Sequence, residues 1–245
     1  MRISQAWIVA RHDMGVFRQK FGILIGLIAF PIGVGFGFPL LVAYLILPHA
    51  GPDPSTSLSG LLDAFSFWFV IGAASLPTSI ASYSIVGEKL SKSLEPLLST
   101  PTTDGEILLG KSLAALLPTL LGVWAGSVVF QVLIDLETRG PFGYLYYPNP
   151  QMAVVLFVAA PLAALLAIEA AVVISSRVTD IRSAQQYAGL IFLPFIFLYV
   201  VAEVRLTLDA TNLLYISAGL AGVVLVLFFA STRAFRREEI LTRWK

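Results

Sequence analysis

The sequence contains no cysteine among its 245 residues, so neither a disulfide nor thiolate chemistry is available to the chain. Cysteine usage therefore says nothing about the redox compartment. Only two histidines are present, and His12 and His49 fall on opposite sides of the first long apolar run, too far apart to share a metal ion. We expect no metal site and no cofactor bound by this chain.

Catalytic motifs are absent as well. The sequence has no H-E-x-x-H, no G-x-S-x-G, no paired intramembrane aspartates and no Cys–His set. No residue is predicted to be catalytic, and a membrane enzyme is disfavoured.

Charge is scarce too: 13% of the residues are charged and 57% are hydrophobic, whereas a soluble domain carries about 25% charged residues. The sequence therefore predicts an all-α integral membrane protein. Apolar runs of about 20 residues cross the hydrocarbon core as helices. Six such runs predict transmembrane helices at 21–47, 61–86, 112–134, 151–175, 187–203 and 212–231.

Fourteen of the 16 Lys and Arg residues fall on one side of these six runs, and only Arg139 and Arg205 fall on the other. Positive residues collect on the cytoplasmic side, so we expect both termini in the cytoplasm and the protein in the plasma (inner) membrane. No nucleic-acid partner is expected. Five tyrosines then form an aromatic belt near the outer boundary: Tyr44, Tyr144, Tyr146, Tyr147 and Tyr215.

The predicted organisation is an N-terminal helix over 1–20, one six-span domain over 21–231 and a basic cytoplasmic tail over 232–245. The N-terminal helix is amphipathic and is expected to lie in the membrane interface. It serves either as a topogenic anchor or as an elbow that transmits motion from a cytoplasmic partner. Its apolar residues recur at spacings of four and three: Ile3, Trp7, Ala10, Met14, Phe17 and Phe21.

A polar cytoplasmic segment, 87–111, separates the second and third runs. It predicts two short helices around a break, because Leu90, Leu94, Leu97 and Leu98 recur at helical spacing while Pro96 interrupts the first helix. A partly apolar helix with no domain of its own to pack on is typical of docking into a partner's groove. A loop helix lying on the membrane is the alternative.

The same segment matches the nucleotide-binding pattern G-x-x-x-x-G-K-[ST] at Gly105–Ser112. A phosphate-binding loop follows a buried strand in a soluble domain, whereas here an apolar run follows. Thr103 and Glu106 instead predict a capping box at a helix start. We interpret the match as coincidental.

Glu169 lies in the fourth predicted span, ~9 Å from its cytoplasmic end by helical rise. An intramembrane carboxylate predicts a functional role, here a cation contact in a translocation path. The alternative is a structural carboxylate bonded to Ser175 or Ser176, or paired with Arg177 or a neighbouring helix.

Small residues at helical spacing predict close helix approach, within the chain or between two copies. These residues are Gly22, Gly26, Gly33, Gly35, Gly37, Gly122, Gly126, Ala163, Ala167 and Ala171.

Two stretches resemble the ABC type-2 exporter permease family. The first is Glu88, then S-L-E-P-L-L-S-T-P at 93–101, then E-I-L-L-G-K at 106–111, which is similar to the family's cytoplasmic loop E-x-x-x-G-T-L-E-x-L-L-x-T-P…E-I-L-x-G-K. Lys92 and Ser93 stand where that pattern has Gly-Thr. The second is 175–186 followed by Leu193-Pro194, similar to the entry to the family's fifth span.

The resemblance implies a transmembrane permease subunit that pairs with a second copy, identical or different, and with separate ATP-binding-cassette subunits. ATP and Mg²⁺ would bind to those ATPase subunits. The apolar interior favours a hydrophobic or amphipathic substrate. An ion-coupled secondary transporter or channel using Glu169 is the alternative. The ATPase-coupling residues implied by position are Glu88, Lys89, Leu94, Glu95, Pro96, Leu97, Leu98 and Thr100.

Overall fold

The computed structural model describes residues 3–51, 53–91, 102–178, 180, 182–190, 193–194, 197 and 210–234. Two π-helical turns, η1 (Val42–Ile46) and η3 (Val155–Ala159), and one 3₁₀ turn, η2 (Leu47–His49), adjoin the α-helices. No β-strand occurs in these ranges, which confirms the predicted all-α class for them. The α-helices are α1 (Ile3–Phe17), α2 (Phe21–Leu41), α3 (Pro54–Ser91), α5 (Asp104–Phe142), α6 (Pro150–Val154), α7 (Ala160–Arg177) and α9 (Ala210–Ala234).

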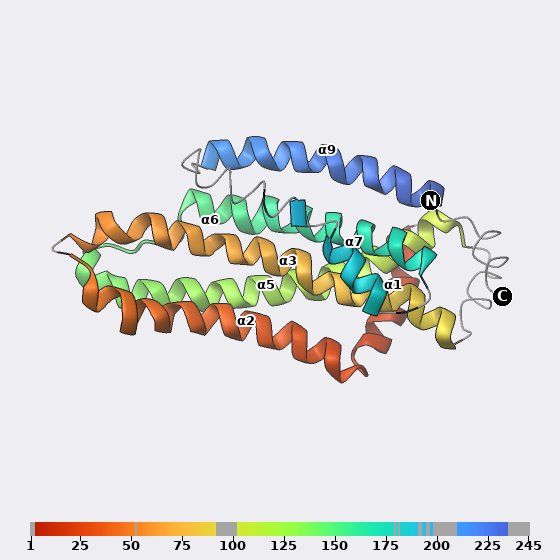
Figure 1. Ribbon diagram of the computed structural model, residues 1–245, viewed down its shortest axis with the longest axis horizontal. Coiled ribbons are helices and arrows are strands. Elements are labelled where there is room, and N and C mark those ends of the chain that lie inside the picture. The colour runs from red at the N-terminus through yellow and green to blue at the C-terminus, as the bar shows by residue number, and fades with distance from the viewer. Residues whose placement is uncertain are drawn as a thin grey trace.

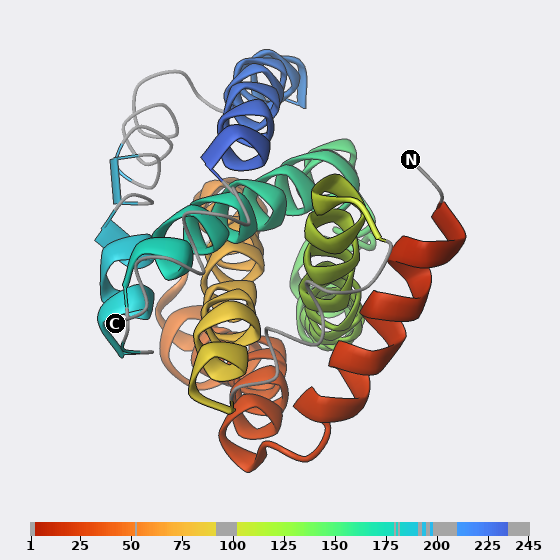
Figure 2. The ribbon, with the colours of Figure 1, turned by 90° about the vertical axis from the view of Figure 1, so that its right-hand side faces the viewer.

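The long helices lie side by side in an elongated bundle (Figure 1). α3 packs against both α5 and α7, α2 packs against α5, and α9 packs against α7. α1 lies across one end of the bundle, next to the start of α5 (Figure 2). The last turn of α3, the first turn of α5 and the end of α9 lie at this same end, which we call the base of the bundle.

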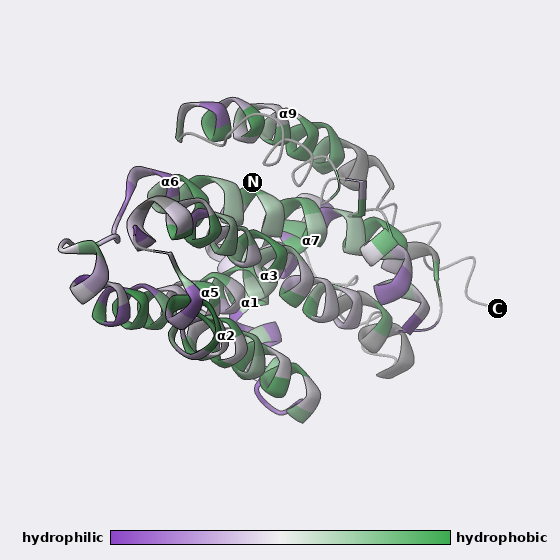
Figure 3. Cartoon of the chain, turned by 60° about the vertical axis from the view of Figure 1, so that its left-hand side comes forward, coloured by the Kyte–Doolittle hydropathy of each residue, from purple (hydrophilic) through white to green (hydrophobic). Residues whose placement is uncertain are grey.

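Five helices within the described ranges are long and apolar enough to cross a membrane: Phe21–His49, Ser57–Tyr83, Asp104–Phe142, Pro150–Ser175 and Ala210–Phe229. They match five of the six predicted spans. The predicted span at 187–203 lies mostly outside the described residues, apart from helical positions at 187–190, 193–194 and 197. Hydrophobic residues make up much of the long helices (Figure 3). Many of their large apolar side chains are exposed, as lipid contact requires.

The helices extend beyond the apolar runs that predicted them. α5 starts at Asp104 rather than 112 and continues to Phe142 rather than 134. Its early start follows from the capping box at Thr103, which satisfies orphan backbone donors of the first turn. α3 likewise continues through Ser91. Leu90 therefore belongs to α3 and not to a separate short helix, and Leu94, Leu97 and Leu98 lie outside the described residues.

Several of the small residues predicted to permit close helix approach are used within the chain. A Cβ on Gly126 of α5 would lie 2.9 Å from the Cα of Pro31 on α2, so only glycine permits this approach. Ala163, Ala167 and Ala171 are buried on α7, in the apolar core. Four other glycines, all on α2, have open space where a Cβ would be: Gly22, Gly26, Gly33 and Gly37.

The predicted apolar face of α1 is only partly the face that packs on the bundle. Ala10 and Phe17 of that face are buried against the protein, whereas Ile3 is 76% exposed and Trp7 is 48% exposed. The buried face is instead Ala6, Val9, Ala10, Asp13 and Phe17. α1 therefore packs on the protein through three small apolar residues, Phe17 and one carboxylate, while Ile3 and Trp7 face outward.

Candidate functional site

The capping box at the start of α5 is present as predicted. The Thr103 hydroxyl accepts a hydrogen bond from the Glu106 backbone N–H (3.3 Å), and the Thr103 N–H donates to Glu106 Oε2 (3.0 Å). The whole Gly105–Ser112 match to the nucleotide-binding pattern is therefore α-helical. A helix whose backbone N–H groups bond within it does not form the loop that cradles phosphates.

Each of the last three residues of that match has a contact inside the protein. A Cβ on Gly110 would lie 2.6 Å from the Ala6 carbonyl oxygen, so α1 approaches α5 at its backbone. Lys111 Nζ lies 3.3 Å from Asp13 Oδ2 on α1. Ser112 Oγ donates to Glu169 Oε1 on α7 (3.2 Å). These contacts engage Gly110, Lys111 and Ser112 with other helices of the protein.

Asp13 and Lys111 form a buried ion pair at the base of the bundle. The Lys111 side chain is 1% exposed and that of Asp13 is 6% exposed. His12 Nδ1 also lies 3.3 Å from Asp13 Oδ1. The sequence reasoning missed this pair, although Asp13 is the only acidic residue in 1–20 and falls in helical phase with Ala6, Ala10 and Phe17.

Glu169 is buried, at 2% exposed, between α7 and the start of α5. Its Ser112 contact corresponds to the neighbouring-helix alternative. Ser175 donates to the Val172 carbonyl of its own helix (3.1 Å). The role of Glu169 in a translocation path stays a prediction.

The predicted ATPase-coupling residues belong to the last turn of α3 and to the connection between α3 and α5. Glu88 and Lys89 lie in the last turn of α3. Leu94, Glu95, Pro96, Leu97, Leu98 and Thr100 lie outside the described residues. Because α3 ends and α5 begins at the base, the connection between them starts and finishes there (Figure 1).

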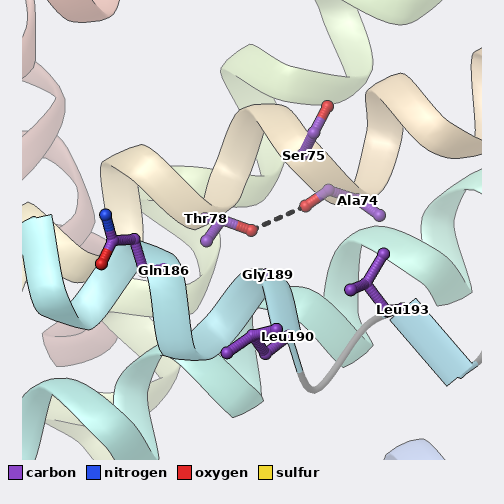
Figure 4. Close-up of a pocket in the computed structure, with 7 residues that line it drawn as sticks. All are labelled: Ala74, Ser75, Thr78, Gln186, Gly189, Leu190 and Leu193. Carbon is purple, nitrogen blue, oxygen red and sulfur yellow. Dashed lines mark hydrogen bonds between the residues drawn. The ribbon is translucent and has the colours of Figure 1, made fainter.

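A cavity of about 540 Å³ lies between α3 and the helical stretch 182–190. Figure 4 shows Ala74, Ser75 and Thr78 on the α3 side and the other lining residues opposite. The Thr78 hydroxyl donates to the Ala74 carbonyl (2.8 Å) and so is engaged within α3. The lining is mainly apolar, with Leu190 and Leu193 more than half exposed.

The opposite end of the bundle is fixed by two tyrosines that the sequence placed in an outer aromatic belt. Tyr147 is only 2% exposed and donates its hydroxyl to the Leu62 carbonyl (2.9 Å), while Tyr146 donates to the Ser59 carbonyl (2.9 Å). Burial, with the nearby Asp63 carboxylate, raises the pKa of both phenols, which keeps them protonated as donors. The burial of Tyr147 argues against a place in an exposed belt, and Tyr146 is partly buried, whereas Tyr44, Tyr144 and Tyr215 are exposed.

We expect Tyr147→Phe to lower the free energy of unfolding by about 1 kcal/mol or more, because the Leu62 carbonyl loses its donor in a buried site. The measurement is thermal unfolding of the purified protein in detergent. Tyr144→Phe is the matched control, since Tyr144 is 52% exposed. An equal effect of the two substitutions would contradict the assigned hydrogen bond.

Among the described residues, no three His, Asp or Glu side chains come together as a metal-ion site. No curated protein matches this chain. A family model described as ABC-2 family transporter protein matches residues 7–230, nearly the whole sequence. With several apolar helices long enough to span a membrane, the chain is a multi-pass membrane protein that belongs to the ABC-2 transporter permease family.

Proposed function

We propose that this chain is the permease subunit of an ABC-type exporter. It moves a hydrophobic or amphipathic substrate, using ATP that a separate ATPase subunit hydrolyses. The family match over 7–230 carries this proposal. The helical Gly105–Ser112 segment supports the assignment of ATP hydrolysis to a partner, because its Lys111 and Ser112 side chains engage Asp13 and Glu169.

The orientation that we propose places the base of the bundle in the cytoplasm. α1, the end of α3, the start of α5 and the end of α9 share that end, in agreement with the excess of Lys and Arg predicted there. The ATPase then docks on the 87–111 segment, which includes the connection between α3 and α5. A second permease copy completes the transporter.

The cavity between α3 and 182–190 supports the proposed substrate class. Its lining is mainly apolar, and its polar groups are the hydroxyls of Ser75 and Thr78 and the amide of Gln186. Such a surface favours apolar groups and leaves a few hydrogen bonds for a polar head. We place the cargo against this face of α3. Glu169 is not part of this lining, and its role in a translocation path is a separate proposal.

We expect Glu95→Arg to weaken binding of the ATPase subunit by about thirtyfold or more, since losing a charged contact at an interface core costs about 2 kcal/mol or more. Membrane insertion should be unchanged. The measurement is the amount of ATPase that co-purifies with the tagged chain from its own membranes. Glu239→Arg is the control, because it makes the same change in the C-terminal tail. Wild-type recovery of the ATPase with Glu95→Arg would remove Glu95 from the docking surface.

A further inference from the structure

Three consecutive residues of α5 join it to two other helices at the base of the bundle. Gly110 receives the backbone of α1 at Ala6, and Lys111 pairs with Asp13 of the same helix. Ser112 bonds to Glu169 of α7. These three contacts lie six to eight residues past the start of α5 at Asp104, where the 87–111 segment ends. Any displacement of the end of that segment therefore acts first on this junction.

Apolar packing and the Asp13–Lys111 ion pair differ in how firmly they fix the position of α1 on α5. Apolar packing alone holds membrane helices together weakly, because lipid chains are as apolar as the partner helix. An ion pair between side chains that are 1% and 6% exposed is directional, and separating it leaves a charge in a medium of low dielectric constant. The pair therefore fixes the rotation and register of α1 on α5, while Gly110 sets how closely the two backbones approach.

We propose that Asp13 and Lys111 are positioning residues of the transport cycle. They hold α1 on the first turns of α5, so that the two move as one body when the 87–111 loop moves. The Ser112–Glu169 hydrogen bond connects this body to α7. The inference rests on the proposed function for the source of the movement, while the fixing of α1 by the ion pair is a property of the chain alone.

The absence of cysteine makes a direct test simple, because single cysteines label one site each. Ser4→Cys on α1 and Leu121→Cys on α5 place spin labels at two exposed positions. The distance between the labels is measured in the complex with its ATPase, without nucleotide and with ATP trapped. We expect one narrow distribution that is the same in both states.

The test variant is Asp13→Leu with Lys111→Met, which removes both charges and leaves neither buried alone. We expect its distance distribution to broaden, and to shift when ATP is trapped, while the amount of bound ATPase stays at the wild-type level. A purely structural contact would not produce a nucleotide-dependent shift between α1 and α5. Lys111→Arg, which keeps the charge, should retain the narrow distribution, and Arg11→Gln on the exposed side of α1 is the control.

Two results would overturn the inference. One is a distribution in the double variant that equals that of the wild type in both states. The other is a wild-type distance that itself changes when ATP is trapped, since α1 and α5 would then move separately. If no ATPase accompanies the wild-type chain, the proposed function fails, and the same labels on the chain alone still decide whether the ion pair fixes α1.

Discussion

Replacing Lys111 by methionine is expected to lower the free energy of unfolding by about 3–5 kcal/mol, because it leaves the Asp13 carboxylate buried without the Lys111 ammonium. The effect is large because both residues are buried, Lys111 at 1% exposed and Asp13 at 4%. Thermal or denaturant unfolding of the detergent-solubilised chain measures it.

Adding Asp13→Leu to Lys111→Met should recover most of that loss, because two well-packed apolar side chains replace the pair without a buried charge. Arg11→Met is the control for the loss of a cation on the exposed side of α1, with an expected change within about 0.5 kcal/mol. Wild-type stability in the single Lys111→Met variant would contradict the ion pair.

The single Lys111→Met variant also tests whether the Gly105–Ser112 match binds nucleotide. Measurable ATP binding by the wild-type chain that Lys111→Met abolishes would show that the match is functional.

Gly110→Ala is expected to destabilise the contact of α1 with α5 by about 1–3 kcal/mol, the usual cost of overpacking. The new Cβ would lie 2.6 Å from the Ala6 carbonyl oxygen and 2.7 Å from the Val9 Cβ. A backbone oxygen cannot rotate away as the end of a flexible side chain can, so α1 must shift as a whole. Unfolding of the purified chain and the label distance between α1 and α5 both report this shift.

Gly15→Ala is the matched control, since Gly15 is also helical and a Cβ there meets nothing within 4 Å. That substitution should be neutral or stabilising by up to about 1 kcal/mol, through lower entropy of the unfolded chain. If Gly110→Ala were as harmless as Gly15→Ala, the close approach of α1 to α5 would be wrong.

The number and positions of the described spans could be predicted because long apolar runs have few other structures in lipid. The helix ends could not be read from the same runs. α5 passes through Glu106 and Lys111 near its start because the capping box and the ion pair satisfy these polar groups. Hydropathy alone counts such residues against a span.

Contacts between residues far apart in the sequence could not be predicted from the sequence pattern. Asp13 and Lys111 are 98 positions apart, and Ser112 and Glu169 are 57 apart, so nothing in the local spacing pairs them. Tyr146 and Tyr147 are of the residue type that anchors proteins at membrane interfaces. Only the path of the chain after α5 turns their hydroxyls toward the carbonyls of α3. The capping box was predictable because its two partners lie within one helical turn.

The central claim is that a separate ATPase drives this permease through the 87–111 loop. The most direct measurement is affinity purification of the tagged chain from its native membranes in mild detergent, with quantification of every protein that accompanies it. We expect a soluble ATP-binding-cassette protein in one-to-one ratio, lost when Leu94 and Leu98 are both changed to Asp. An intact, stable chain with no ATPase would contradict the account and favour an ion-coupled transporter, with Glu169 as the residue to substitute next.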